Sequence, residues 1–180
     1  LEPQDLNELL DIARLKEAAG PVGGDGAVGT GGLYARHCAR CHGTSGDGAG
    51  RLAWLQDPYP RDFRRGIYKF KSTPSTTPPT DDDLMRVLKE GTPDTAMPSF
   101  VDLDDDQVLS LVDYVKYLSR RGQFERAVIM EVALEFDEDE PLLDWGQREQ
   151  NPDRFDEELD PWRFLAEEIV QRWADAPGAV

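Results

Sequence analysis

The sequence has 180 residues, and its 39% hydrophobic residues are enough for one core of modest size. Its net charge of −16 would repel phosphates, which argues against nucleic acid as a partner. The charge is uneven, because residues 131–180 hold 16 acidic and 4 basic residues, whereas residues 36–71 hold eight Lys or Arg against three Asp. No apolar run approaches the roughly 20 residues that a membrane-spanning helix needs.

The N-terminal segment is predicted to be a helix over residues 3–19, followed by a flexible linker. Asp5 is a suitable N-cap. The apolar positions at helical spacing are Leu6, Leu9, Leu10 and Leu15. Residues 20–32 contain seven glycines in thirteen positions, as is typical of a flexible linker. The first helix is therefore expected to be an appendage that docks either on the domain or on a partner.

Both cysteines and both histidines lie within residues 37–42, in the run His-Cys-Ala-Arg-Cys-His. C-x-x-C-H is the attachment pattern of c-type haem. Residues 30–41 are predicted to form a helix on which Cys38 and Cys41 lie on one side, so both thiols can form thioethers along the same edge of a porphyrin. His42 follows directly, and its imidazole can bind the iron from one face.

The segment after the motif is predicted to be mainly loop. Residues 51–80 have no helix or strand period and are rich in Arg, aromatic residues and Pro. A loop of this length inside a domain is usually functional, and wrapping a cofactor would explain it. A short helix then begins at aspartates 81–83 and ends at Gly91. A loop that carries Met97 next to a proline follows it.

Three further helices are predicted toward the C-terminus. Asp104 and Gln107 form a capping box, and the helix that they open is expected to end at Gly122. Its apolar stripe consists of Val108, Leu111, Val112, Val115 and Leu118. Residues 123–138 could form a helix or a strand, and we favour a helix because the neighbouring elements are helical. Residues 161–173 have the pattern of a last amphipathic helix.

A six-coordinate haem iron needs a second ligand opposite His42. His37 lies on the attachment helix itself and cannot reach the opposite face of the same haem. Met85 and Met130 lie among apolar residues, so both are expected to be ordinary core residues. Met97 is the remaining candidate, because a loop between two amphipathic helices can hold its thioether toward a cofactor.

Residues 28–122 resemble a class I (mono-haem) c-type cytochrome. The resemblance rests on an aromatic residue four positions before the first cysteine, C-x-x-C-H-G, a short helix, a Met-Pro loop, and a last helix with an aromatic pair, Tyr114 and Tyr117. It implies an all-α class I cytochrome c fold of three to four helices around one covalently bound haem, with long loops. The expected domains are an N-terminal helix and Gly-rich linker (1–27), the cytochrome c domain (28–122), and an acidic helical extension (123–180).

The resemblance also implies contacts within this domain. The first and last helices of the family cross, and Tyr34 with one tyrosine of the aromatic pair would form this contact. The glycine of the crossing falls at Thr30, which would shift the contact. The family's proline, whose carbonyl orients the axial histidine, has Pro58 and Pro60 as candidates.

The expected cofactor is one haem c, held covalently by Cys38 and Cys41 and bound axially by His42 and Met97. His/Met ligation raises the reduction potential and leaves no iron site for a substrate, so the chain is expected to be an electron carrier rather than an enzyme. It could still be an electron-relay domain or subunit of an oxidoreductase. The expected partners are redox proteins: a dehydrogenase, a quinol-oxidising complex, or a terminal oxidase or reductase.

Export to the periplasm or its equivalent is expected, because haem c is attached on the outer side of a membrane. The chain starts at Leu1 and shows no signal peptide, so we expect a removed signal or membrane anchor ahead of it. Membrane association is expected only through such an anchor or through a partner. Basic residues between positions 36 and 71, together with Tyr68 or Trp54, are expected to neutralise or hydrogen-bond the haem propionates.

Three other functions are compatible with parts of the sequence. The first is a haem domain of a larger redox enzyme, or a sensor or peroxidase-like protein with a labile Met97 ligand. A dithiol oxidoreductase would need a thiolate of lowered pKa, usually at the start of a helix after a strand. A structural zinc site would need four Cys or His ligands, and here all four lie within one and a half helical turns.

Overall fold

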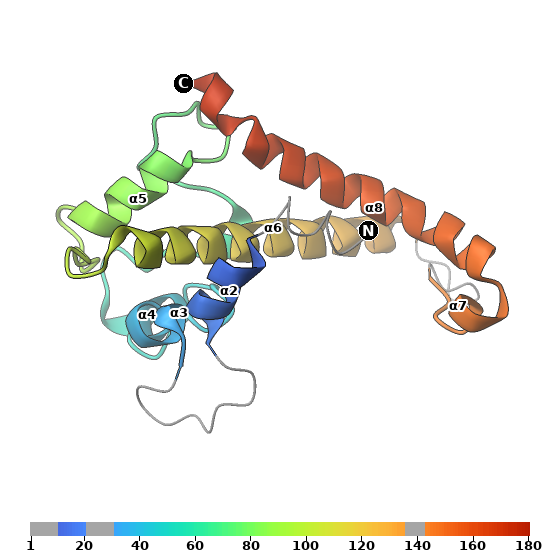
Figure 1. Ribbon diagram of the computed structural model, residues 1–180, viewed down its shortest axis with the longest axis horizontal. Coiled ribbons are helices and arrows are strands. Elements are labelled where there is room, and N and C mark those ends of the chain that lie inside the picture. Colours follow the sequence, from blue (N-terminus) through green and yellow to red (C-terminus); the bar gives the residue numbers. More distant parts are fainter. Residues whose placement is uncertain (1–10, 21–30, 136–142) are drawn as a thin grey trace.

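The computed structural model describes residues 11–20, 31–135 and 143–180 (Figure 1). These residues form helices and loops without any β-strand, which confirms the predicted all-α fold. The elements in chain order, with η for a short 3-10 helix, are α2 (Ile12–Ala19), α3 (Leu33–His37), α4 (Ala39–His42), η1 (Ala53–Leu55), η2 (Phe63–Arg65), α5 (Asp81–Glu90), α6 (Asp105–Glu135), α7 (Gln147–Gln150), α8 (Pro152–Ala174) and η3 (Ala176–Ala179). None of the described helices is long and apolar enough to span a bilayer.

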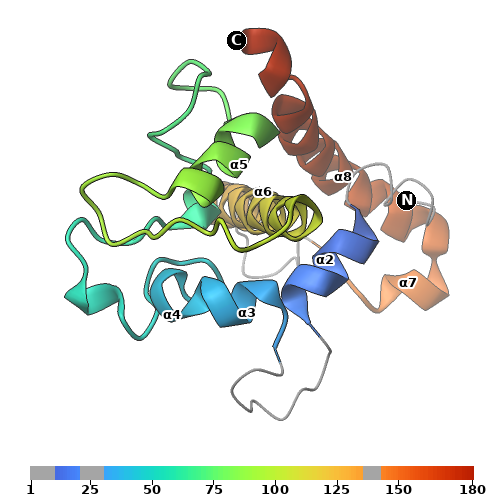
Figure 2. The ribbon, with the colours of Figure 1, turned by 60° about the vertical axis from the view of Figure 1, so that its left-hand side comes forward.

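The fold is organised around α6, which runs through the middle of the molecule in both views (Figures 1 and 2). The predicted capping box is present. The N–H of Gln107 donates to the Asp104 carboxylate at 2.8 Å, and the Asp104 N–H donates to Gln107 Oε1 at 3.2 Å. All five residues of the predicted apolar stripe are buried, with exposed fractions of 0 to 7%. This face of α6 therefore forms the centre of the hydrophobic core.

The predicted end of this helix at Gly122 is wrong, because α6 continues as one helix to Glu135. Gly122 is buried, and a Cβ at this position would lie only 2.4 Å from the Cα of Arg64. The glycine thus allows the η2 backbone to approach the helix closely, which is a tertiary requirement rather than a helix stop. The predicted helix over residues 123–138 is confirmed as far as Glu135, and its last three residues lie outside the described part.

The N-terminal helix α2 packs against α6 and α3 (Figure 2). The guanidinium of Arg14 pairs with Asp113 of α6 at 3.4 Å, and the hydroxyl of Ser110 donates to the Glu17 carboxylate at 2.6 Å. Ala18 is completely buried. The sequence left open whether this helix docks on the domain or on a partner. In the structure, α2 docks on the domain.

The predicted single helix over residues 3–19 is wrong at Asp11. This residue has an extended backbone (φ −72°, ψ 97°), and its side chain accepts a hydrogen bond from the N–H of Arg14. Asp11 is therefore the N-cap of α2, which begins at Ile12. The predicted cap Asp5 lies outside the described residues.

Helix α5 begins and ends as predicted. Thr80 and Asp83 form a capping box, and Gly91 ends the helix with a φ of +74°. The Asp83 side chain is only 2% exposed, and it also accepts hydrogen bonds of 2.9 Å from the N–H and the hydroxyl of Ser72. One buried carboxylate thus fastens the long loop before α5 to the start of the helix.

The region between α4 and α5 is loop apart from η1 and η2, as predicted. Its last part is wound around Lys71, whose ammonium group donates to the backbone carbonyls of Thr73 at 3.2 Å, Thr77 at 2.7 Å, and Pro74. The loop is therefore held together by internal polar contacts as well as by Asp83.

The C-terminal helix α8 contains the predicted helix of residues 161–173 and begins earlier, at Pro152. Its C-terminal end reaches the region of α5 and α6 (Figure 1). Ile169 and Trp173, each 4% exposed, belong to the same hydrophobic cluster as the buried face of α6. The domain boundaries at residues 27 and 122 stay a prediction.

Candidate functional site

The C-x-x-C-H motif lies on α3 and α4, which are two short helices instead of the single predicted helix over residues 30–41. They are separated at Cys38, where the backbone departs from regular helix (φ −115°, ψ −42°). Cys38 is buried and Cys41 is partly exposed, and neither forms a disulfide. The two thiols are thus present on adjacent turns and are chemically available for thioether bonds.

His42 is held in one orientation by its neighbours. Its side chain lies 3.0 Å through Nδ1 from the backbone carbonyl of Arg61, and its ring stacks on Phe63 at 4.4 Å between centroids and 18° between planes. Burial lowers the pKa of the imidazole, although the contact with the Arg61 carbonyl acts in the opposite direction. A hydrogen bond of this kind fixes the tautomer, with the proton on Nδ1 and the lone pair on Nε2.

The prediction that Pro58 or Pro60 supplies the carbonyl that orients His42 is wrong. The acceptor is the carbonyl of Arg61, directly after Pro60. A backbone carbonyl has no signature in the sequence, because any residue can supply it. The sequence did not distinguish Phe63 from the other aromatic residues of this loop.

The contact between the first and last helices of the domain is confirmed for Tyr34 and Tyr114, whose ring centroids are 4.8 Å apart. The hydroxyl of Tyr34 donates a buried hydrogen bond of 2.9 Å to the carbonyl of Gly43. Burial of this phenol raises its pKa. Tyr34 therefore connects the residue directly after His42 to the core helix α6.

Two glycines make a close backbone contact at the start of α3. A Cβ on Gly32 would lie 2.2 Å from the backbone nitrogen of Gly20 and 2.3 Å from the carbonyl oxygen of Ala18. The end of α2 and the start of α3 thus meet backbone to backbone, which only glycine permits. The predicted crossing position, Thr30, lies outside the described residues.

Met97 lies in the loop between α5 and α6 and is partly buried against the hydrophobic cluster that includes Cys38. Its N–H donates to the hydroxyl of Thr95 at 3.1 Å, and its carbonyl accepts from the N–H of Thr92 at 3.2 Å. Three residues later, Phe100 meets the ring of His37 edge-on at 5.9 Å. The backbone of the loop is thus fixed on both sides of Met97, and the loop contacts α3 through Phe100 and His37.

The other two methionines differ from each other. Met85 packs against the core cluster, as predicted. Met130 was predicted to be a core residue as well, but its side chain is 62% exposed. Its neighbour Ile129 is similarly exposed, at 64%.

The loops beside the motif expose apolar side chains that fit a large flat cofactor. Six large apolar or aromatic residues of residues 51–104 are between 52% and 74% exposed: Trp54, Leu55, Tyr59, Ile67, Phe70 and Val101. These residues belong to the loop between α4 and α5 and to the loop between α5 and α6. Large apolar side chains left exposed in this number are available for binding a ligand. Together with two thiols and an oriented imidazole, this surface is compatible with haem c.

Several groups considered for the propionates already have partners. The Arg64 guanidinium forms two hydrogen bonds to Asp62, at 3.0 and 3.1 Å, and the ammonium of Lys71 is surrounded by loop carbonyls. The hydroxyl of Tyr68 is 2.6 Å from the hydroxyl of Ser119. Trp54, which is 74% exposed, is therefore the better aromatic candidate for a propionate contact.

Cys38 lacks the property of a reactive thiol. Burial, together with the nearby Cys41, raises the pKa of the Cys38 thiol to about 12, whereas a nucleophilic cysteine needs a lowered pKa. The motif also follows a helix rather than a strand. Within the described part of the chain, no three His, Cys, Asp or Glu side chains are grouped so that they could hold a metal ion.

Comparison with known proteins gives a family for this region. Residues 30–115 match the family described as "Cytochrome C oxidase, cbb3-type, subunit III", and the match includes both the C-x-x-C-H motif and Met97. Among solved structures, the chain is similar to a chain of the Kuenenia stuttgartiensis reducing HAO-like protein complex Kustc0457/Kustc0458, with 37% sequence identity and a TM-score of 0.47. This similarity covers 61% of this chain and 44% of that chain, so it spans less than half of that relative. No curated protein matches the chain.

Proposed function

Because residues 30–115 form a class I c-type cytochrome domain, whose members transfer electrons through covalently bound haem c, we propose that this chain carries a single haem c and relays electrons through it. Cys38 and Cys41 would hold the haem through thioether bonds, and His42 and Met97 would be the ligands of its iron. The haem supplies, when bound, an iron that takes up or gives one electron by changing between its ferric and ferrous forms.

The single observation that carries this proposal is the environment of His42. The Arg61 carbonyl accepts the Nδ1 proton, which leaves Nε2 as the ligand nitrogen, and the stacked ring of Phe63 limits rotation of the imidazole. A metal-binding histidine must be neutral, and burial favours the neutral form by lowering the pKa of this group. The chain therefore prepares His42 as an axial ligand.

Met97 is proposed as the second ligand because its loop has the rigidity that a weak thioether ligand requires. Hydrogen bonds to Thr92 and Thr95 fix the backbone on either side of it. Met85 is packed into the core, and Met130 lies on the exposed face of the distal half of α6. If both residues bind the iron, no iron site is left for a substrate, which favours electron transfer as the function.

We place the relay outside the cytoplasm, between a redox partner that supplies electrons and one that accepts them. Cytochrome c domains are typically exported, since their haem is attached there. The exposed side chains near the motif include the basic residues Arg36, Arg40 and Arg51 and the aromatic residue Trp54. A dehydrogenase, a quinol-oxidising complex or a terminal oxidase or reductase would each fit this role.

The proposal is tested by the absorption spectrum and redox titration of the haem-loaded protein. The pigment should stay with the protein in acidified acetone, and a pigment that is extracted would refute covalent attachment. Met97→Ala should lower the reduction potential and remove the methionine-to-iron absorption band of the oxidised protein. Met130→Ala is the matched control, because this side chain is exposed and should leave both properties unchanged.

Loss of the absorption band in the control but not in Met97→Ala would reverse the assignment of the second ligand. If the wild-type protein lacked the band and bound carbon monoxide readily, Met97 would be a labile ligand. The chain would then fit the alternative of a haem sensor or peroxidase-like domain.

A further inference from the structure

A row of aromatic rings leads from His42 through the protein to α8. His42 stacks on Phe63 at 4.4 Å between centroids, and Phe63 lies parallel to Tyr68 at 6.3 Å, with 11° between the planes. Tyr68 then meets Trp173 edge-on at 6.1 Å. All three distances are in or near the range of direct aromatic contact. The row thus connects the proposed iron ligand to the C-terminal helix through three successive ring contacts.

The row is fixed by contacts with α6. The hydroxyl of Tyr68 lies 2.6 Å from that of Ser119, which in turn donates to the carbonyl of Val115 at 2.9 Å. The guanidinium of Arg120 lies 5.7 Å from the centroid of the Trp173 ring. Ser119 and Arg120, which are successive residues of α6, therefore contact Tyr68 and Trp173.

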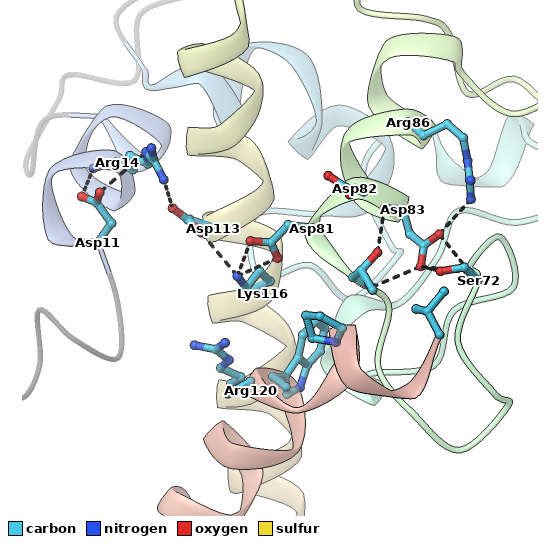
Figure 3. Close-up of a pocket in the computed structure, with 15 residues that line it drawn as sticks. Asp11, Arg14, Ser72, Asp81, Asp82, Asp83, Arg86, Asp113, Lys116 and Arg120 are labelled. Carbon is cyan, nitrogen blue, oxygen red and sulfur yellow. Dashed lines mark hydrogen bonds and ion pairs between the residues drawn. The ribbon is translucent and has the colours of Figure 1, made fainter.

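The far end of the row reaches a pocket open to solvent. Trp173 is one of the residues that line a pocket of about 750 Å³ where α2, α5, α6 and α8 meet. Figure 3 shows its charged wall, in which Lys116 contacts Asp81 and Asp113. The pocket contains neither cysteine nor methionine and is distinct from the exposed apolar loops beside the motif. It offers a second face at which another molecule can approach the row of rings.

Trp173 belongs to the hydrophobic cluster, but its side chain also carries a polar group. Its indole N–H is buried, and no hydrogen-bond partner for it is found among the described residues. A buried unpaired donor costs free energy that an aliphatic side chain would avoid. Trp173 also lies outside residues 30–115, so this ring comes from the extension and not from the region that matches the family.

We propose that Phe63, Tyr68 and Trp173 form an electron-transfer route between His42 and the pocket face formed by α5, α6 and α8. The inference rests on the proposed function, because it requires haem iron bound to His42. It adds a second port for electron exchange, on the proximal side, besides the exposed loops near the motif. The partner at this port is a one-electron redox protein.

The proposed step transfers one electron and no atoms. One electron leaves the reduced partner and arrives at the ferric iron, which becomes ferrous, and no bond forms or breaks. The rings are neither oxidised nor reduced, because they provide electronic coupling only. Closely spaced π systems couple better than the aliphatic gap that would replace a missing ring, so the rate should depend on each ring in the row.

The test uses a ruthenium photoreductant attached to a single introduced cysteine in the haem-loaded protein. Asp82→Cys places the label on the rim of the pocket, and Asp102→Cys, an identical change in the exposed loop beside Met97, is the matched control site. Flash photolysis gives the rate of electron transfer from the label to the iron. Each labelled protein is compared with its Trp173→Leu and Trp173→Phe derivatives.

The route predicts that Trp173→Leu slows transfer severalfold from the label at position 82 and leaves the rate from position 102 unchanged. Trp173→Phe, which keeps a ring and protects the fold, should retain most of the rate. Equal rates in all three proteins at position 82, with an unchanged reduction potential, would overturn the route. A fall at both label sites would overturn it as well, since it would indicate a general structural effect. Absence of covalent haem in the spectrum would refute the proposed function instead.

Discussion

Replacing Asp83 should destabilise the protein more than any other single change in the first turn of α5. The buried carboxylate accepts hydrogen bonds from the N–H and hydroxyl of Ser72 at 2.9 Å and from the N–H of Thr80 at 3.2 Å. Asp83→Ala would remove the acceptor from all three donors and release the loop from the helix. The ion pair with Arg86 matters less, because the arginine side chain is 50% exposed.

The size of the effect follows from the donors that lose their acceptor. A hydrogen bond to a charged group contributes about 1.5–3 kcal/mol, but water can replace part of it at these part-buried donors. We therefore expect Asp83→Ala to lower the free energy of unfolding by about 2–3 kcal/mol. For a protein of this size, that corresponds to a fall in Tm of about 4–12 °C.

The assay is urea unfolding of the haem-loaded protein, followed by far-UV circular dichroism. Asp82→Ala is the matched control, because Asp82 is the exposed neighbour in the same helical turn and has the same interaction with the helix dipole. Its effect should stay within about 0.5 kcal/mol. A loss of the same size in both variants would refute the special role of Asp83.

The pH dependence gives an independent check. Burial alone would raise the pKa of Asp83, but the hydrogen bonds from Ser72 and Thr80 outweigh it and lower the pKa. A carboxylate with a lowered folded-state pKa stabilises the fold above its unfolded pKa, and this contribution is lost as the pH falls through the folded value. The stability difference between wild type and Asp83→Asn should therefore be constant near neutral pH and shrink only in acid. A difference that grew on acidification would contradict the sign.

Two further changes test the contacts around the motif. Tyr34→Phe removes the buried bond to the Gly43 carbonyl and should cost about 1–2 kcal/mol in urea unfolding; an unchanged midpoint would contradict this. Gly32→Ala places a Cβ 2.2 Å from the Gly20 nitrogen, so it should cost more than about 1 kcal/mol and speed hydrogen exchange in α2. Gly178→Ala, where an added Cβ meets nothing within 4 Å, is the control, and an equal loss there would disprove the clash.

Local patterns in the sequence predicted the helices well, because a capping box or an apolar stripe is encoded by residues close together in the chain. Asp104 with Gln107 and the buried face of α6 are examples. The motif also predicts the roles of the cysteines and His42, since their chemistry depends on a fixed spacing, and these roles stay a prediction. Family resemblance was confirmed by the match over residues 30–115.

The misses have tertiary causes. Gly122 follows two arginines and so resembles a helix end. In the structure it instead leaves room for the backbone of Arg64, and a contact between such distant residues has no pattern in the sequence. Met130 was predicted to be buried because its neighbours are apolar, yet an apolar stripe does not tell which face another helix covers. The carbonyl of Arg61 has no side-chain signature at all. Each of these depends on segments that are far apart in the chain.

The continuity of α6 has a mechanical consequence. A helix of 31 residues is a stiff rod about 46 Å long, whereas a glycine-rich linker would let the attached parts sample many orientations. The redox domain and the distal half of α6 therefore turn as one body. A protein that bound the distal end of α6 would be held at a fixed distance and angle from the redox domain. The helix would therefore align this protein with the iron as soon as it bound.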